Sequence, residues 1–521
     1  MKRIYKPSSL PWCFTSLRRF ANGCGQSSGK NGLVLGVYEG CEPGQFTLTP
    51  SAVKFDESVD GKFKELVKGT KLRPPGRVQI FGNLGDEFYL VAASALGHES
   101  ATMNPKEQLD ECRENIRIAA GTGAMQLQSQ GISHIFVEGF SNAEAAAEGA
   151  SLAIWRYQDW KAKENQMPKA DIQLWGSDDK DGWIRGIIKG EAQNRAREIQ
   201  EAPANLMTPA IFAQFAQELL CPCGVEITMR DRDWIESNNM MAFLTMTRGS
   251  CEQPCVVEIN YCGAGREEKP IAFVGKGVTF NAGGLHLKQC RGMSLFRGDL
   301  AGAAAIVGMI RAIAQLSLPI NVTALLAMYE NLPSGLAVKP GDVVMARNGK
   351  TIVIEDTDKE GRVVSADILS LIAQYSPCLT VNIATSHIGL LKSLGSPVNA
   401  VFSTSDVMYW ELERAGMISG DRVWRLPFWK YFRSRITDYT SVDVANSGKG
   451  VGGMPCLGAA YLLEFSPPDV DFIYLDISAT GLDHPGIGMP YLRRHCMSGR
   501  PVRLLTQFLY QIACPHESEP C

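Results

Sequence analysis

Two glycine-rich segments, each directly after an apolar run, most constrain the fold of this chain. Segment 275–284 (GKGVTFNAGG) follows the apolar run 271–274, and segment 356–362 (DTDKEGR) follows the run 351–354. Short apolar runs bounded by turn residues are typical of buried strands. Open α/β sheets bind ligands in the crevice at the carboxyl ends of their strands. The pattern therefore predicts an α/β fold whose functional site lies where the two segments meet.

The polar residues in and between these segments are lysines and carboxylates. Each alone would most often be a solvated loop charge, but their recurrence at strand ends favours a site. Carboxylates gathered in this way can bind divalent metals, and two ions about 3.5–4 Å apart drive hydrolysis. The candidate residues are Lys276, Lys288, Asp299, Asp358 and Glu360.

Length and composition limit the class of protein. A chain of 521 residues is expected to hold two domains. Its 45% hydrophobic and 21% charged residues are ordinary for a soluble globular protein. The net charge of −3 gives no electrostatic case for binding nucleic acid, and no run approaches the roughly 18 apolar residues of a membrane span. The cysteines lack zinc-ribbon spacing, so we expect mostly reduced, buried thiols.

The first 38 residues contain no Asp or Glu but carry several Lys and Arg residues. Leu10, Phe14 and Leu17 fall on one helical face of this segment. A basic, acid-poor, amphipathic start is typical of a mitochondrial transit peptide, and a disordered basic tail is the alternative. We predict a transit peptide over residues 1–30 and localisation in the mitochondrial matrix.

The rest of the chain divides into two α/β regions joined by a helix. Alternating apolar strands and helices, including a helix over 142–160, predict an N-terminal α/β domain over 31–182. A helix over 183–204, ended by Pro203, connects it to a larger α/β domain over 205–521. Within that domain, Asn348-Gly349 predicts a hairpin with a type I′ turn.

Several segments resemble the leucyl (cytosol) aminopeptidase family of two-metal exopeptidases. The resemblance covers about residues 31–500 and implies a smaller N-terminal α/β domain, a larger catalytic-type domain with a central mixed sheet, and a hexamer made of two trimers. The segments that carry it are FVGKGVTFNAGGLHLK, RGDLAGAAA, DTDKEGR, EAPANLMTP, ENLPSG, KPGDVVMARNGKTI and NAEAAAEGASLA.

The resemblance also implies a role for each matching residue, with two Zn or Mn ions as cofactors. Lys276 and Asp299 match ligands of one metal, Asp358 matches a ligand of the other, and Glu360 matches a carboxylate that touches both. Lys288 matches the lysine that polarises the scissile carbonyl. Arg362 matches the arginine that holds a bicarbonate acting as general base.

The chain departs from the family pattern at the metal site itself. Asn281 stands where the family has an aspartate that bridges the two metals. An amide offers one neutral carbonyl oxygen, and its NH₂ group is a donor that cannot bind a cation. We therefore expect partial or absent metal occupancy.

Further departures lie beside the ligands. Asp356 replaces an asparagine that contacts substrate in the family, Lys359 replaces a small alanine, and His286 replaces a small polar residue. His387 and Ile388 are bulkier than the residues expected at the substrate pocket. Asp356 could in principle swing in as a ligand, but the resemblance places it on the substrate side, where it cannot bridge.

Three hypotheses follow from this pattern. The first is a catalytically impaired, structural family member in homo- or hetero-hexamers, similar to the insect sperm-leucyl aminopeptidases of the paracrystalline material in sperm mitochondria. The alternative is an active metal-dependent aminopeptidase that releases N-terminal amino acids such as leucine from peptides. The third is a hexamer that keeps a peptide pocket without cutting.

Overall fold

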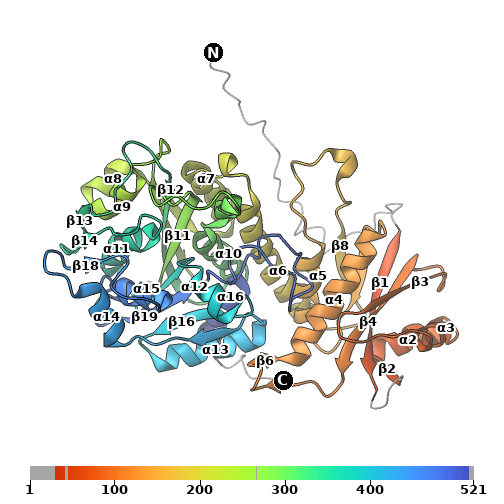
Figure 1. Ribbon diagram of the computed structural model, residues 1–521. Helices are drawn as coiled ribbons and strands as arrows, with labels where there is room; N and C mark the ends of the chain where they lie inside the picture. The colour runs from red at the N-terminus through yellow and green to blue at the C-terminus, as the bar shows by residue number, and fades with distance from the viewer. Residues whose placement is uncertain (1–29, 41–44, 266, 516–521) are drawn as a thin grey trace.

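One long helix, α6 (Lys180–Glu201), joins two α/β domains that lie side by side (Figure 1). The computed structural model describes residues 30–40, 45–265 and 267–515, so the expected targeting segment lies outside it, apart from residue 30. Asp179 caps α6 by accepting a 2.9 Å hydrogen bond from the Gly182 N–H. Gly186 lets α6 approach the N-terminal domain closely, because a Cβ there would lie 2.2 Å from the Glu144 carbonyl oxygen.

The N-terminal domain is a largely parallel sheet covered on both faces. Its strand order is β3-β4-β1-β7-β8, with β2 paired to β1, and only β2 and β3 run antiparallel to their neighbours. Leu33 and Leu35 of β1 pack under α2 and α3, while Val34 packs under α4 and α5. The elements are β1 (Asn31–Glu39), β2 (Phe46–Leu48), α2 (Pro50–Ser58), α3 (Lys62–Lys68), β3 (Val78–Gly82), β4 (Leu90–His98), β5 (Met103–Asn104), β6 (Leu109–Asp110), α4 (Glu111–Ser129), β7 (His134–Glu138), α5 (Ala143–Ile154) and β8 (Asp171–Trp175).

The C-terminal domain is built on a mixed sheet in the order β17-β16-β19-β15-β11-β12-β10-β9. The four central strands β19, β15, β11 and β12 are parallel, and antiparallel pairings flank them. The strands are β9 (Glu226–Arg230), β10 (Cys255–Cys262), β11 (Ile271–Asn281), β12 (Asn321–Asn331), β15 (Leu379–Ala384), β16 (Asn399–Ser403), β17 (Val423–Arg425) and β19 (Asp471–Asp476). The predicted two-domain α/β fold with a central mixed sheet is confirmed.

Helices cover both faces of this second sheet. Ile271 and Phe273 of β11 pack with α6, α7, α10, α13 and α16, whereas Ala272 and Val274 pack with α9, α11 and α15. The helices are α7 (Pro209–Leu220), α8 (Arg232–Ser237), α9 (Met241–Thr247), α10 (Ala301–Gln315), α11 (Glu360–Ile372), α12 (Gly389–Leu394), α13 (Asp406–Ser419), α14 (Lys430–Thr437), α15 (Met454–Leu463) and α16 (Val502–Ala513). Because β11, β12, β15 and β19 are parallel, their carboxyl ends meet at one edge of the sheet.

A small sheet of β13 (Val343–Met345), β14 (Thr351–Val353) and β18 (Val444–Ala445) lies beside the main one. The hairpin of β13 and β14 forms as predicted, but its turn is not type I′. Only Gly349 has a positive φ, of 87°, and its N–H donates to the Ala346 carbonyl. This is the longer hairpin loop, in which a type I turn precedes a left-handed glycine.

Two further expectations fare differently. Of the cysteines in the described ranges, Cys255 and Cys456 are buried and the rest are partly or fully exposed, so the prediction of mostly buried thiols is wrong.

One segment of the described ranges, Met293–Gln315, is long and apolar enough to cross a membrane. However, 72% of its most apolar part is buried inside the protein. It includes α10, a core helix of the second domain.

Candidate active site

The predicted site residues come together where β11 ends and α11 begins. Lys276 lies within β11 and Asn281 is its last residue, while Asp358 and Glu360 flank the start of α11. Asp299 follows a 3₁₀ helix, Met293–Gly298, and immediately precedes the first turn of α10. The parallel pairing of β11 with β12 and β15 places these segments at a single sheet edge.

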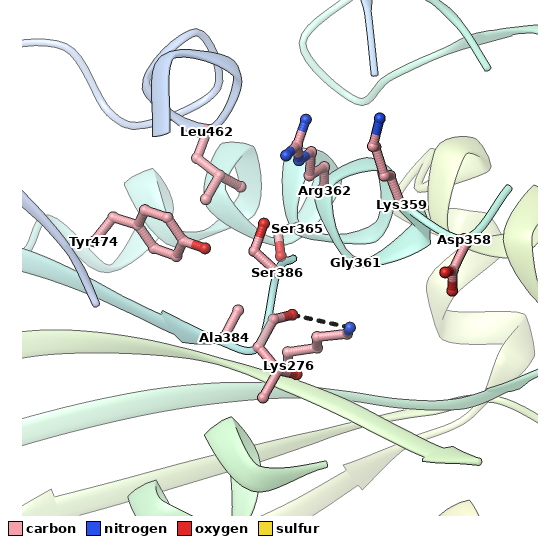
Figure 2. A pocket seen from close by; sticks show the side chains of 11 residues that line it. Lys276, Asp358, Lys359, Gly361, Arg362, Ser365, Ala384, Ser386, Leu462 and Tyr474 are labelled. Atoms are coloured by element: carbon pink, nitrogen blue, oxygen red, sulfur yellow. Dashed lines mark hydrogen bonds between the residues drawn. The ribbon is translucent and has the colours of Figure 1, made fainter. Parts of the chain in front are cut away.

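Lys276 is a buried ammonium between two carboxylates. Its Nζ lies 2.8 Å from Asp299 Oδ2 and 3.1 Å from Glu360 Oε1. It also donates to the Thr385 carbonyl at 3.0 Å, the bond dashed in Figure 2. Burial alone would lower the pKa of Lys276, but attraction to Asp299 and Glu360 outweighs it and raises the pKa above its usual value.

The Asn281 amide sits between the same two carboxylates and is 1% exposed. Its Nδ2 donates to Asp299 Oδ2 at 2.7 Å and to Glu360 Oε1 at 3.0 Å. Its Oδ1 accepts from the Gly283 N–H at 2.8 Å and from Asn331 Nδ2 at 3.0 Å. The NH₂ group, not the oxygen, therefore faces the candidate ligands.

The neighbours of Asn281 fix this orientation. An amide flip would turn its NH₂ group toward the Gly283 N–H, which is a donor. It would also turn NH₂ toward Asn331 Nδ2, which is held as a donor by the Thr357 carbonyl at 3.0 Å. Amide orientation is assigned from the hydrogen-bond network. In the flipped state, the Asn281 NH₂ group would face two N–H donors, and its oxygen would face the carboxylates of Asp299 and Glu360.

A second ion pair lies beside the first. Lys288 Nζ is 2.5 Å from Asp358 Oδ1 and 3.8 Å from the centroid of the Phe296 ring. Burial raises the pKa of Asp358, against the opposing attraction of Lys288. Asp358 is thus paired with a lysine in this structure.

The cluster carries more carboxylates than ammonium groups. Burial raises the pKa of Glu360 to about 7, against attraction to Lys276 and with added repulsion from Asp299 and Asp358. Asp299 differs, because Lys276 and Lys288 overcome its burial and lower its pKa. Glu360 Oε2 is buried and has no hydrogen-bond partner among the described residues.

Arg362 lies beneath the mouth of the site and is 4% exposed. It donates to the Asn446 carbonyl at 2.9 Å and the Met454 carbonyl at 3.0 Å, while its buried Nε has no partner in the described structure. Burial lowers its pKa. Arg362 lines a cavity of about 10 Å³ that also borders Lys276, Asp358 and Lys359. Figure 2 shows the side chains of Arg362 and Lys359 extending in the same direction from the start of α11.

Three of the departures, at His286, Asp356 and Lys359, contact one another at the mouth of the site. Asp356 Oδ1 lies 2.7 Å from His286 Nδ1, and Asp356 Oδ2 lies 3.2 Å from Lys359 Nζ. Asp356 is therefore in contact with two side chains and does not turn toward the carboxylates of the candidate metal site.

The two bulky residues predicted at the substrate pocket lie in the loop after β15. His387 Nδ1 accepts a hydrogen bond from the Gly389 N–H at 2.8 Å, and Ile388 is 56% exposed. Burial, with Lys359 and Arg362 nearby, lowers the pKa of His387.

The residues present do not fit a pair of metal ions bridged at position 281. A bridging ligand offers an anionic oxygen to each ion, and Asn281 instead points two N–H bonds at the carboxylates. Among the residues that the structure describes, no three His, Cys, Asp or Glu side chains are grouped so as to hold a metal ion. What this arrangement provides is a hydrogen-bonded, ion-paired cluster.

Sequence reasoning missed two residues that organise the cluster. Asn331 is the last residue of β12 and pairs in register with Asn281, and it orients the Asn281 amide. Thr385 donates to Asp299 Oδ1 at 2.5 Å. Asn331 lies within the family-like segment ENLPSG, so its strand-end position was a usable signal. Thr385 directly follows β15, so its place at a strand end was a signal of the same kind.

Comparison with known proteins places both domains. Residues 34–164 match the model of the cytosol aminopeptidase family, N-terminal domain, and residues 194–506 match that of its catalytic domain. The chain is 39% identical over 493 residues to cytosol aminopeptidase of Xenopus tropicalis, with 94% of each chain covered. It is 38% identical to that of Bos taurus over 502 residues, or 95% of each chain.

Solved structures agree with this assignment. The bottromycin maturation enzyme BotP in complex with Mn superposes with a TM-score of 0.79 at 26% identity, covering 94% of this chain and all of that one. A second structure of BotP gives a TM-score of 0.78 at 26% identity, covering 93% of this chain and 99% of that one. Both domain models and these relatives span nearly the whole described fold, and the chain therefore belongs to the cytosol aminopeptidase family.

Proposed function

We propose that this chain is a catalytically impaired cytosol aminopeptidase homologue that serves as a structural subunit of a mitochondrial assembly. The observation that carries the proposal is the Asn281 amide, whose NH₂ group faces Asp299 and Glu360. A donor at this position cannot join two cations. Because function depends on the site and not on the fold alone, the retained family fold does not by itself imply hydrolysis.

The assembly that best suits this proposal is a homo- or hetero-hexamer with related subunits. The resemblance to insect sperm-leucyl aminopeptidases supports a place in the mitochondrial matrix of sperm, and the basic segment 1–30 supports the address. Fusing residues 1–30 to a fluorescent reporter tests the address. Import into mitochondria is expected, and a cytosolic reporter would contradict it. Light scattering of the purified chain measures the subunit number.

Metal content and hydrolysis together test the loss of activity. Purified full-length chain is incubated with Mn²⁺ or Zn²⁺, desalted, and assayed for bound metal and for release of the aniline from leucine-anilide. We expect less than one tightly bound ion per chain and turnover near background. Two tightly held ions with ordinary turnover would overturn the proposal.

The change Asn281→Asp separates the metal defect from the pocket defect. A carboxylate there would meet oxygens of Asp299 and Glu360, and a divalent cation would relieve their repulsion. We expect partial recovery of metal binding, with turnover still limited by His387 and Ile388. Asn281→Gln is the matched control, since it adds no charge.

An active aminopeptidase is the second candidate function. Its support is the retention of Lys276, Lys288, Asp299, Asp358 and Glu360 together with relatives called cytosol aminopeptidases. Arg362, with an unpartnered buried Nε, would in that case hold the bicarbonate that the family resemblance implies. Bicarbonate-dependent release of N-terminal leucine from peptides would favour this candidate.

A further inference from the structure

Three loops at the mouth of the site are tied together by residues far apart in the sequence. His286, in the loop after β11, contacts Asp356 at 2.7 Å, and Asp356 contacts Lys359 at 3.2 Å. Lys359 Nζ also donates to Ser447 Oγ, in the loop after β18, at 2.5 Å. We call His286, Asp356, Lys359 and Ser447 the loop latch.

Three of the four latch residues stand at positions where this chain departs from the pattern of the family that it resembles. His286, Asp356 and Lys359 each replace a different residue of the resembling motifs, and they lie up to 73 positions apart in the chain. Independent decay of an unused site would scatter replacements without pairing them. Here the structure brings all three into one connected set of contacts.

Each replacement makes another tolerable. Lys359 is only 8% exposed, and a buried ammonium is costly unless it is paired and hydrogen-bonded. Asp356 and Ser447 provide both of these partners. Asp356 is in turn partly buried, with its side chain 17% exposed, and it is paired with Lys359 and contacted by His286.

The inner cluster is cross-linked in the same manner. The Asn281 amide joins Asp299, which precedes α10, to Glu360 at the start of α11. Lys288, from the loop after β11, reaches Asp358 beside α11. These contacts connect the same strand end and helix starts that metal ions would connect if the family's ligands were complete. Bound cations stabilise a fold by cross-linking it in this way.

We infer that the site of this chain is held together by its own side chains, so that the stability of the fold does not depend on a divalent metal, and that the loop latch is a coupled unit within it. This inference rests on the proposed loss of the two-metal centre. It adds that the hydrogen bonds of Asn281 and the ion pair of Lys288 with Asp358 connect the strand end and helix starts of the site, and that the loop latch ties together the loops beside them.

Thermal unfolding with and without metal tests whether the stability of the fold is independent of a divalent metal. The full-length chain is melted in EDTA and in saturating Mn²⁺ or Zn²⁺, beside the variant Asn281→Asp. We expect the wild-type melting temperature to shift by less than about 1 °C, whereas the variant melts lower in EDTA and rises by about 5 °C or more with metal. A wild-type rise as large as the variant's would overturn the inference.

A double-mutant cycle tests the latch. Asp356→Asn leaves the buried Lys359 charge without a carboxylate, and Lys359→Met leaves Asp356 with His286 as its one side-chain contact in the latch, so each should lower the melting temperature. The double variant should lower it by less than the sum. The exposed pair Lys339–Asp342, with the same sequence separation and a 3.1 Å contact, is the matched control and should be additive. Additive effects at both pairs would contradict the latch.

Hydrogen exchange gives a local measurement of the latch that uses a single variant, so it can be made even if the double variant does not fold. The His286 N–H donates to Thr357 Oγ1 at 2.9 Å, so its exchange reports closure of the loop after β11. His286→Ala should speed exchange throughout 283–287 without a metal effect. Unchanged exchange there would count against the latch.

These outcomes separate the inference from the proposed function. A chain that is inactive but strongly stabilised by metal would refute metal independence while leaving catalytic impairment in place. A chain that hydrolyses leucine-anilide but keeps a metal-insensitive melting temperature and a coupled latch would refute the proposed function while leaving the inference in place.

Discussion

Two buried charged clusters in this protein are put together in opposite ways. In the first, at the boundary between the domains, Glu148 accepts from Arg117 at 2.6 Å and from Arg503 at 3.0 Å. Arg117 also pairs with Glu114 at 3.1 Å. The two guanidinium groups overcome burial and lower the pKa of Glu148. We call this set the interdomain cluster.

The second cluster is the candidate active site, where three carboxylates meet two ammonium groups. Burial raises the pKa of Glu360 to about 7, and its Oε2 has no partner in the described part of the chain. Excess negative charge of this kind is what a cation site needs, and perturbed pKa values gather at functional sites. The difference teaches that the interdomain cluster neutralises its buried carboxylates with guanidinium groups, whereas the candidate active site keeps an excess of buried carboxylates.

The interdomain cluster should be the most sensitive to losing one charge. Glu148→Ala leaves Arg117 and Arg503 buried without their shared carboxylate, and breaking a buried pair costs about 3–5 kcal/mol. Denaturant unfolding at neutral pH measures the loss. Glu236→Gln, in the exposed pair with Arg232, is the control. A loss below about 1 kcal/mol would show that water or other groups compensate the two arginines.

Glu138 is a buried glutamate with no guanidinium partner among the described residues, and we expect its ionisation to make the free energy of unfolding depend on pH. Glu138 Oε2 accepts from the Gly36 N–H and the Thr49 hydroxyl, both at 2.9 Å, and burial raises its pKa to about 7 despite these bonds. Since the folded pKa exceeds the unfolded value near 4.5, the folded state holds the proton more tightly. Stability should therefore fall as pH rises from about 4.5 through 7, by about 3 kcal/mol.

Glu138→Gln checks this sign. The amide oxygen can still accept from Gly36 and Thr49, and it carries no charge at any pH. We expect the variant to be more stable than wild type above pH 7 and similar to it near pH 4.5, by urea unfolding across the range. Parallel pH profiles for the two proteins would show that Glu138 is not the group that titrates.

The sequence predicts where the candidate active site lies but not how its side chains are oriented. Apolar runs and turn residues predict the strand over 271–274 and its meeting with segment 356–362, because short apolar runs bounded by turn residues are local signals. They do not predict that this strand continues through Lys276 to Asn281. The orientation of the Asn281 amide has no such signal, since Asn331 on the neighbouring strand sets it. Likewise, the helix expected over 142–160 ends at Ile154, where the extended Trp155 stacks under Arg197 at 4.2 Å. Long-range contacts of this kind override local propensity.

Removing the Asn281 side chain should cost less than removing Glu148. Asn281→Ala leaves Asp299 and Glu360 without two hydrogen bonds and leaves the Gly283 N–H without its acceptor. Unsatisfied buried groups cost about 1–3 kcal/mol. We expect a loss in that range by denaturant unfolding, smaller than for Glu148→Ala. A loss as large as that of Glu148→Ala would mean that the amide, rather than the lysines, holds the site together.

The smallest effect should come from the exposed ion pair that serves as the control. Arg232 and Glu236 lie one helical turn apart on α8, their contact is 2.9 Å, and each side chain is 49% exposed. Solvent screening and side-chain entropy leave such pairs worth about 0.3–0.5 kcal/mol. Glu236→Gln should change the free energy of unfolding by no more than this, and the small loss should shrink further in high salt. Suppose instead that Glu236→Gln lowered the free energy of unfolding as much as Asn281→Ala does. Burial would then not explain why the charged clusters contribute more to stability than an exposed ion pair, and the numbers of positive and negative groups would be the remaining difference.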